Sequence, residues 1–411
     1  MQELAITGRG VISPIGNNIQ DFEASLDAGT IPFVPSDWTD PEKGEYGWTS
    51  PVTDFTATDW MTERVREGTN RSVQFGIAAA VQAVEESGVG LDPLRTSITV
   101  GVTGDSAPIA EAQAALDLKG PDAVPPKLTL RANQFFCAAQ LAMRWGLHAP
   151  ILTLEHACAA GLDAIGQGGR LIEMDDADVV IAVGTHTVLP DVFRHSAYGP
   201  PREGPPPDME LATDPTRQCM PFDVNRRNLI GAEGAGAVVL ERPEHAKERG
   251  AHIYGYVKGY AALSDAHHPT APNPSGEYEA LVMERALERA GVASSDVDAL
   301  IAHGTSTIKG DIAEMLAINS VFKDRPTPLP VTSTKGQLGH TAAASGIISV
   351  LAGIHCMETG RFVPTANTFD VEPEAEFEVI TGSPAEINID LMQLNAFGFG
   401  GHNSSMLLGR S

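Results

Sequence analysis

The chain has 411 residues, 42% of them hydrophobic, and it carries 28 basic and 53 acidic side chains, which gives a formal net charge of −25. This apolar content is enough for a substantial core and excludes wholesale disorder. The negative field repels phosphate groups, which argues against nucleic acid and anionic membranes as general partners.

The start of the chain and its cysteines favour a cytoplasmic protein. The first residues, "MQELAITGRGVISPIG", predict a strand and a Gly/Pro turn rather than a cationic, apolar leader. No run approaches the roughly 18 apolar residues of a membrane span. The four cysteines, at positions 137, 158, 219 and 356, have no paired spacing, which indicates reduced thiols.

Apolar runs that alternate with helical patterns predict a layered α/β fold. The runs are apolar at consecutive positions, as in strands covered on both faces. They lie at residues 98–100, 151–154, 179–183, 237–240, 299–302 and 329–333. Segments rich in proline and glycine at 30–60, 117–127 and 199–217 predict loops outside this core.

Two patterns occur twice, in the same order. Residues 77–104 and 280–305 each predict an amphipathic helix, a turn and a strand. Residues 151–172 and 329–354 each run from a strand, through one polar reactive-type residue, into a helix rich in alanine and glycine. This order favours a duplicated α/β unit; the alternative is a similarity common to α/β proteins in general. Duplication would place Cys158 and His340 at corresponding strand-to-helix corners.

Cys158, in "EHACAAG", is either an inert apolar filler or a nucleophile. The helix predicted from Ala159 to Ile172 would direct its N-terminal N–H groups and dipole at the sulfur, which stabilises a thiolate. The small residues that follow Cys158 leave room for an acyl group. Sulfur suits a two-step transfer, because a thioester is readily made and then broken.

Two histidines follow predicted strands in the same manner. His303 comes after 299–302 and His340 after 329–333. Each could be a structural cap, but a common placement with Cys158 is harder to explain by packing. Zinc is another alternative for these three residues; we expect no metal, because the short ligand spacings of zinc sites are absent.

Two further features could serve the same site. Lys335 is either solvated or tunes a nearby histidine electrostatically. The stretch "NAFGFGGHN" at 395–403 holds three glycines beside two phenylalanines. It is either a flexible loop or a source of backbone N–H groups for an oxyanion hole.

These motifs together carry a family resemblance. The sequence resembles elongating β-ketoacyl-acyl-carrier-protein synthases, whose thiolase fold is a duplicated α/β unit in α-β-α-β-α layers. The matching motifs cover nearly the whole chain in the family's order: "AITGRGVISPIG", "HACAAG", "PFDVNRRNLIGAEGAGAVVLE", "SDAHHPTAP", "AHGTSTIKGDIAE", "STKGQLGHTAAASG" and "NAFGFGGHN". The resemblance implies two thiolase-like halves, 1–245 with the nucleophile and loop excursions and 246–411 with both catalytic histidines.

The resemblance also implies roles for particular residues. Cys158 becomes the acyl-accepting nucleophile. His303 and His340 become the pair that promotes decarboxylation of malonyl groups and stabilises the enolate. Lys335 matches the family's supporting lysine, and Glu314 belongs to its network.

The remaining implied roles concern the substrate. The backbone N–H groups of Cys158 and Phe399 would form the oxyanion hole, and the Phe399 side chain would gate the nucleophile. Thr305 and Thr307 match threonines that hydrogen-bond the phosphopantetheine arm. Because the acyl carrier protein brings this arm, no cofactor of the enzyme's own is expected.

Several positions depart from the family pattern. His156 replaces a small hydroxyl residue, and Phe135 and Phe136 could narrow or reshape the acyl pocket. Other departures are at Asn225, Arg227 and Asn228. They leave the chemistry intact but favour a specialised substrate over housekeeping fatty-acid elongation. The segment "CAAGLDAIG" is also similar to ketosynthase subunits of type II polyketide systems, which pair with a chain-length factor.

The resemblance implies two protein partners. The family is dimeric, with the strand before the nucleophile pairing across the interface; homodimer and heterodimer with a chain-length factor both stay open. The acyl carrier protein is acidic, so we expect a cationic landing site at Arg64, Arg66 and Arg71, with Lys127 and Arg131 nearby. An ordinary solvated helix end is the alternative.

The predicted function is decarboxylative condensation of malonyl-carrier with an acyl chain held on Cys158. A non-condensing chain-length factor would typically lack this cysteine. A thiolase would carry a second catalytic cysteine late in the chain, yet no cysteine follows Cys356. An inactive scaffold or acyl-binding module is the alternative from another class.

Overall fold

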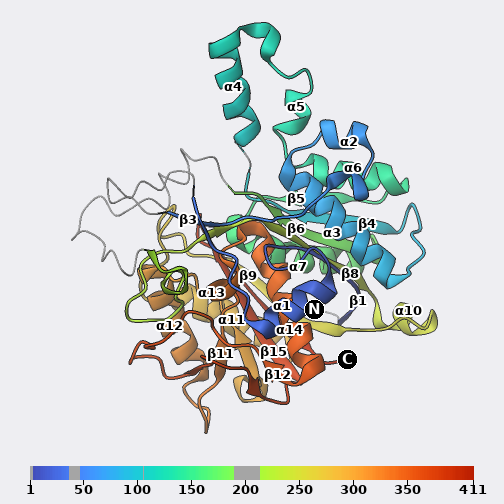
Figure 1. Ribbon diagram of the computed structural model, residues 1–411. Coiled ribbons are helices and arrows are strands. Elements are labelled where there is room, and N and C mark those ends of the chain that lie inside the picture. The colour runs from blue at the N-terminus through green and yellow to red at the C-terminus, as the bar shows by residue number, and fades with distance from the viewer. Residues whose placement is uncertain (1–2, 37–46, 105, 189–212) are drawn as a thin grey trace.

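The computed structural model describes residues 3–36, 47–104, 106–188 and 213–411 (Figure 1). The parts of the predicted loops at 37–46 and 199–212 lie outside these residues. The main sheet has eleven strands: β1 (Leu4–Ile12), β4 (Thr96–Gly101), β5 (Ile151–Leu154), β6 (Val179–His186), β8 (Gly234–Glu241), β9 (Gly255–Ser264), β10 (Ala299–Ile301), β11 (Pro330–Thr332), β13 (Glu378–Val379), β15 (Leu391–Gly398) and β16 (His402–Gly409). Two small sheets hold β2 (Val34–Pro35), β3 (Trp48–Ser50) and β7 (Gly231–Ala232), and β12 (Arg361–Phe362) with β14 (Ala385–Glu386).

The helices cover or separate the two halves of this sheet. They are α1 (Ile19–Ala28), α2 (Glu63–Glu67), α3 (Arg71–Ser87), α4 (Ala107–Lys119), α5 (Leu128–Arg131), α6 (Phe136–Trp145), α7 (Ala160–Glu173), α10 (Pro243–Glu248), α11 (Glu277–Ala290), α12 (Ile308–Phe322), α13 (Lys335–Leu338) and α14 (Ser345–Thr359). The short 3-10 turns are η1 (Ala57–Asp59), η2 (Pro121–Ala123), η3 (Ala157–Ala159), η4 (Pro215–Arg217), η5 (Ser294–Asp296) and η6 (Ala342–Ala344).

The sheet consists of two copies of one strand order. From its centre, one half runs β1-β8-β6-β4-β5 and the other runs β9-β16-β15-β10-β11, with β13 added at the end. In both halves the first two pairings are antiparallel and the next two are parallel. The predicted boundary at 245/246 falls inside α10, just before the second copy begins at β9. The corners after β5 and after β11 therefore correspond, and they carry Cys158 and His340.

Three buried clusters produce five layers. The central cluster contains α7 and α14, which pack between the two half-sheets. A second cluster lies under α3 and α6 on the outer face of the N-terminal half, and a third under α11 and α12 on the C-terminal half. Along β6, Val180 and Ala182 face the central cluster, whereas Ile181 and Val183 face the outer one. Consecutive apolar residues thus mark strands covered on both faces, as the sequence predicted.

Glycine allows the outer helix to lie close to the first strand. A Cβ atom at Gly8 would meet the Ala83 carbonyl oxygen at 2.1 Å, and one at Gly10 would meet the Ala79 oxygen at 2.0 Å. No side chain fits between β1 and α3 at these points, so the helix packs directly on the strand backbone. This close packing explains the two glycines of "TGRG" in the first motif.

Two helical segments differ in their surroundings. In Figure 1, α4 and α5 stand away from the body of the protein, and Leu118 on this arm is 82% exposed. By contrast, residues 342–359 are long and apolar enough to cross a membrane, yet 83% of that window is buried. It forms α14 of the central layer, the ordinary composition of a core helix.

Candidate active site

The Cys158 corner is a sharp turn between β5 and α7. Cys158 lies in η3, and α7 begins at Ala160, one residue later than predicted. Ala157, directly before the nucleophile, has φ of 48°, in the left-handed region that residues with a Cβ seldom adopt. Such strain persists where the surrounding structure imposes it, and it is concentrated at functional sites.

The glycine-rich hairpin between β15 and β16 packs directly on this corner. A Cβ atom at Gly398 would lie 3.0 Å from both the Cys158 nitrogen and the His156 oxygen, so glycine allows this close approach without displacing the corner. The backbone N–H groups of Cys158 and Phe399 both act on the Cys158 sulfur and lower its pKa. Two main-chain donors therefore converge where the carbonyl oxygen of a bound thioester would collect charge.

The surroundings of the sulfur act on its ionisation in opposite directions. Burial raises the pKa of Cys158 to about 11, and the opposing effects of Lys335 and of the two backbone N–H groups are smaller. Burial thus opposes the thiolate that the sequence leads us to expect, and that thiolate stays a prediction. The physical reason is desolvation, which disfavours the charged form more than these donors favour it.

His340 makes direct contact with the nucleophile. Its Nε2 lies 3.0 Å from the Cys158 Sγ. The Ala342 backbone N–H donates to Nδ1 at 3.2 Å, and the Ser345 hydroxyl lies 3.0 Å from the same atom. A backbone N–H is always a donor, so Nδ1 is an acceptor and the proton is on Nε2. His340 thus presents an N–H toward the reacting atoms.

His303 completes the group. Its ring packs edge-on against that of His340, with centroids 5.4 Å apart, and also contacts Phe397. Burial, followed by the charge of Lys335, lowers the pKa of both histidines well below the usual value. The surroundings therefore favour the neutral form of both rings, in which each imidazole keeps one N–H donor.

Two buried ionisable side chains, Glu314 and Lys335, hold the His303 backbone from both sides. Glu314 accepts hydrogen bonds from the backbone N–H groups of His303 at 2.8 Å and Gly304 at 2.7 Å. The Lys335 ammonium donates to the His303 carbonyl oxygen. Asn395 also donates to Glu314, at 3.2 Å. Lys335 therefore acts here through the backbone of His303 and through its charge near both rings.

The two threonines after His303 lie together. Their hydroxyl oxygens are 3.0 Å apart, and Thr307 caps α12 by accepting from the Gly310 N–H. Thr305 is buried, and its N–H donates to Asp311 at 2.9 Å. Asp311 in turn lies 3.6 Å from the buried guanidinium of Arg226. The binding of phosphopantetheine by these threonines stays a prediction.

Some functional residues have no signal in a single sequence. Asp311, Arg226 and Asn395 support the site through contacts between distant segments, and Ser345 supports it through His340, five residues away. The motifs "GTSTIKGD" and "NAFGFGG" contain two of them, but the pairing partners lie far away in the chain.

The departures from the family pattern lie mostly outside this network. Asn225, Arg227 and Asn228 are exposed on either side of the buried Arg226, which explains why they leave the site unchanged. Phe135 is 52% exposed at the start of α6, where it packs on Phe136. Their predicted place in the acyl pocket stays a prediction.

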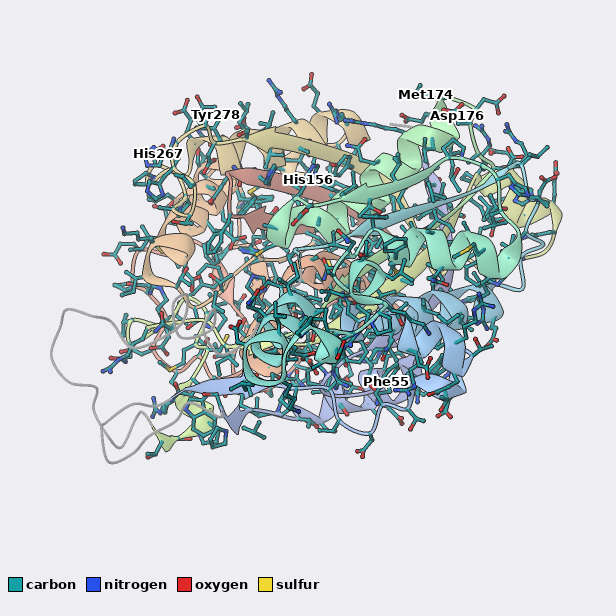
Figure 2. All side chains as sticks on the ribbon, turned by 90° about the horizontal axis from the view of Figure 1, so that it is seen from above. Phe55, His156, Met174, Asp176, His267 and Tyr278 are labelled. Atoms are coloured by element: carbon teal, nitrogen blue, oxygen red, sulfur yellow. The ribbon has the colours of Figure 1, made fainter. Side chains whose placement is uncertain are left out.

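His156 lies beside the nucleophile and has partners of its own. Its Nδ1 is 2.7 Å from the Asp163 carboxylate, and this hydrogen bond raises the pKa of the imidazole. Its ring stacks on that of His402. In Figure 2, His156 is where the green α7 meets the red C-terminal strands.

The predicted carrier-docking residues are largely paired with acids. Arg66 pairs with Glu63, Lys127 with Glu67, and Arg131 with Glu111. Arg71 makes several hydrogen bonds to Glu233, an acceptor that also binds Thr187 and the Val52 N–H. Arg64 is exposed. The region thus offers less free positive charge than its arginine count implies.

Within the described ranges, no cluster of three or more His, Cys, Asp or Glu side chains is arranged to hold a metal ion. The arrangement instead suits acyl transfer, because it brings together a thiol, two neutral imidazoles and two converging backbone donors.

Comparison with known proteins gives matches over the full length. The family model "Beta-ketoacyl synthase, N-terminal domain" matches residues 1–246, and "Beta-ketoacyl synthase, C-terminal domain" matches 254–369. The chain is 31% identical to 3-oxoacyl-[acyl-carrier-protein] synthase 2 of Coxiella burnetii, over 100% of this chain and 99% of that one. It is 29% identical to the protein of the same name from Vibrio harveyi, over 99% and 98%.

Solved structures give the same result. The ishigamide ketosynthase/chain length factor matches with a TM-score of 0.89 and 30% identity, over 100% of this chain and 99% of that one. A type II polyketide acyl-carrier protein complex with its hexaketide-bound ketosynthase matches at 0.87 and 26%, with the same coverage. The predicted family resemblance and fold class are confirmed.

Proposed function

Because the chain belongs to the β-ketoacyl synthase family, we propose that its own site condenses malonyl-carrier with an acyl chain held as a thioester on Cys158. The observation that carries this proposal is the 3.0 Å contact between Cys158 Sγ and His340 Nε2, with His303 packed against the same ring. The assignment as an acyl-transferring condensing enzyme agrees with the relatives' names.

In the first half-reaction the Cys158 sulfur attacks the carbonyl carbon of the acyl-carrier thioester. The oxygen takes the negative charge and accepts hydrogen bonds from the N–H groups of Cys158 and Phe399. The bond to the carrier sulfur then breaks, and the proton of the Cys158 thiol ends on the departing carrier thiol. The acyl group remains on the enzyme.

In the second half-reaction a malonyl-carrier enters. Its carbon–carboxylate bond breaks, carbon dioxide leaves, and the electron pair forms an enolate. The Nε2–H of His340 and the neutral ring of His303 stabilise the enolate oxygen. The enolate carbon attacks the acyl carbonyl on Cys158. The carbon–sulfur bond breaks, the β-ketoacyl-carrier is released, and Cys158 regains a proton.

A specialised pathway is the finer part of this proposal. One solved relative is a type II polyketide ketosynthase and another is a ketosynthase/chain length factor, whereas the curated relatives are called 3-oxoacyl-[acyl-carrier-protein] synthase 2. Type II polyketide or specialised fatty-acid or polyene synthesis agrees with the departures at His156 and Phe135. A chain-length factor is disfavoured because Cys158 is present and hydrogen-bonded to His340.

The same proposal covers the partners. β5 is the outermost strand on its side of the sheet, and Ile151 on it is 40% exposed. A second subunit that adds a strand there would bury this edge, together with apolar residues of the α4–α5 arm. The chain would act in the cytoplasm, with an acyl carrier protein and a second subunit, and without a cofactor of its own.

The test is to incubate the protein with acyl-carrier proteins bearing acetyl, polyketide and saturated fatty-acyl chains. Intact mass should increase by the acyl group on Cys158, and later addition of malonyl-carrier should give a β-ketoacyl-carrier. Absence of any acyl-enzyme would contradict the condensing function. Equal use of all saturated chains would instead favour housekeeping fatty-acid elongation. Sedimentation with and without a chain-length-factor subunit distinguishes homodimer from heterodimer.

A further inference from the structure

The imidazole rings of His156 and His402 stack on one another, close in sequence to the two proposed oxyanion donors. His156 lies two residues before Cys158, and His402 lies three residues after Phe399, so each belongs to one of the two segments that supply a donor. Their centroids are 4.7 Å apart and the planes differ by 13°. Aromatic pairs at this spacing attract one another beyond simple burial.

The first ring is fixed to the protein core. His156 Nδ1 hydrogen-bonds the Asp163 carboxylate of α7 at 2.7 Å. The other oxygen of Asp163, which is buried, accepts from the Tyr260 hydroxyl at 2.7 Å and from the Ser404 hydroxyl. His156 therefore cannot turn without losing its hydrogen bond to a carboxylate whose other oxygen joins α7 to β9 and β16.

The second ring lies against the loop that carries Phe399. A Cβ atom at Gly400 would be 3.1 Å from the His402 ring, so the ring lies directly beside this residue. Gly400 and Gly401 have φ of 84° and 74°, a conformation that glycine adopts freely. Backbone hydrogen bonds hold part of this loop, from the Gly400 N–H to the Pro269 oxygen at 2.7 Å and from the Asp265 N–H to the Gly401 oxygen at 2.9 Å, and the His402 ring adds a side-chain contact beside Gly400.

We propose that the His156–His402 stack is a positioning pair, which holds the Phe399 N–H in register with the Cys158 N–H and so sets the oxyanion hole. Neither ring need touch the substrate. The inference rests on the proposed acyl transfer to Cys158. Small displacements of such donors are costly, because their effect depends on where the oxyanion forms.

The experiment compares two replacements of His402 by single-turnover acylation of Cys158, followed by intact mass. H402A removes the stacking surface and should slow acylation about tenfold, less than the roughly 100-fold loss of a whole oxyanion donor. The KM for acyl-carrier should stay within about twofold, because docking is unaffected. H402F keeps an aromatic face and should recover the wild-type rate within about threefold.

The second part of the experiment replaces the other ring of the stack, that of His156. If both rings act through one stack, the double variant H156A/H402A should be no more than about twofold slower than the slower single variant. Thermal unfolding by circular dichroism checks that each variant folds; if H402A does not, H402S takes its place.

Three results would overturn the inference: an unchanged rate in H402A, a rate in H402F as low as in H402A, or multiplying effects in the double variant. Failure of the wild-type protein to form an acyl-enzyme would instead reject the proposed function itself.

Discussion

The two corresponding corners of the duplicated unit have the same topology but opposite surroundings. The corner after β5 is at the edge of the sheet, and Cys158 there is only partly covered. The corner after β11 lies deep in the protein, and residues 331–352 are all buried. One copy therefore offers a thiol that an incoming acyl group can reach, and the other offers an imidazole shielded from water.

The difference shows that the duplicated topology determines where the two side chains lie, and that their unequal burial determines what each can do. Both corners are brought together by α7 and α14, which pack in the shared central layer. Low exposure keeps His340 neutral, whereas Cys158 is partly accessible and the protein packed around its sulfur raises the pKa of the thiol. The following predictions test this division of roles, beginning with the largest effect.

Replacing Cys158 should abolish the reaction at one corner and leave the reaction at the other intact. C158Q should reduce condensation at least about 1,000-fold, because no other group can hold the acyl chain. Release of carbon dioxide from malonyl-carrier should continue, since the histidine corner is intact. Both are measured with radiolabelled malonyl-carrier. C137A, which changes a buried cysteine of α6, is the control and should retain condensation. Elongation by C158Q would refute the assignment.

Replacing His303 should have the reverse pattern. H303A should slow decarboxylation about 100-fold or more, the usual effect of losing a positioned donor. Acylation of Cys158 by acyl-carrier should fall much less, because His303 is not one of the proposed oxyanion donors, Cys158 and Phe399. Single-turnover mass spectrometry follows acylation. Equal losses in both half-reactions would show that the two corners do not divide the chemistry.

The two corners should also respond differently to pH. With a Cys158 pKa of about 11, the thiolate fraction should rise about tenfold per pH unit between 7 and 10, and alkylation by iodoacetamide should rise with it. Decarboxylation by C158Q should stay level as pH falls from 8 to 6.5, since lowered pKa values keep both histidines neutral. An alkylation rate that levels off by pH 8 would restore the thiolate expected from the sequence.

The smallest expected effect concerns the predicted docking surface for the acyl carrier protein. R64E should raise the KM for acyl-carrier about two- to fivefold, the scale of one rim charge, with kcat unchanged. K323E, an equal charge change at the exposed end of α12, should leave the KM unchanged. Arg71 is a poor test of docking, because its loss leaves the buried Glu233 without its ion pair. Identical KM values for R64E and K323E would reject this landing site.

The sequence predicts most of the fold because its strands are buried on both faces and therefore read as unbroken apolar runs. It also predicts which three side chains meet, since the repeated pattern implies equivalent corners. It does not predict the Cys158 pKa, which depends on how much protein surrounds the sulfur. The pairing of Arg71 with Glu233 and the stacking of His156 on His402 join segments more than 150 residues apart, and no periodicity reports such contacts.

The Gly398 contact has an evolutionary consequence. Because the proposed oxyanion donors are the amides of residues 158 and 399, no exchange of side chains short of proline deletes either of them. Side chains of the proposed acyl pocket are therefore free to change while both donors are kept. Enzymes that keep this hairpin can therefore change their starter preference by point mutations elsewhere.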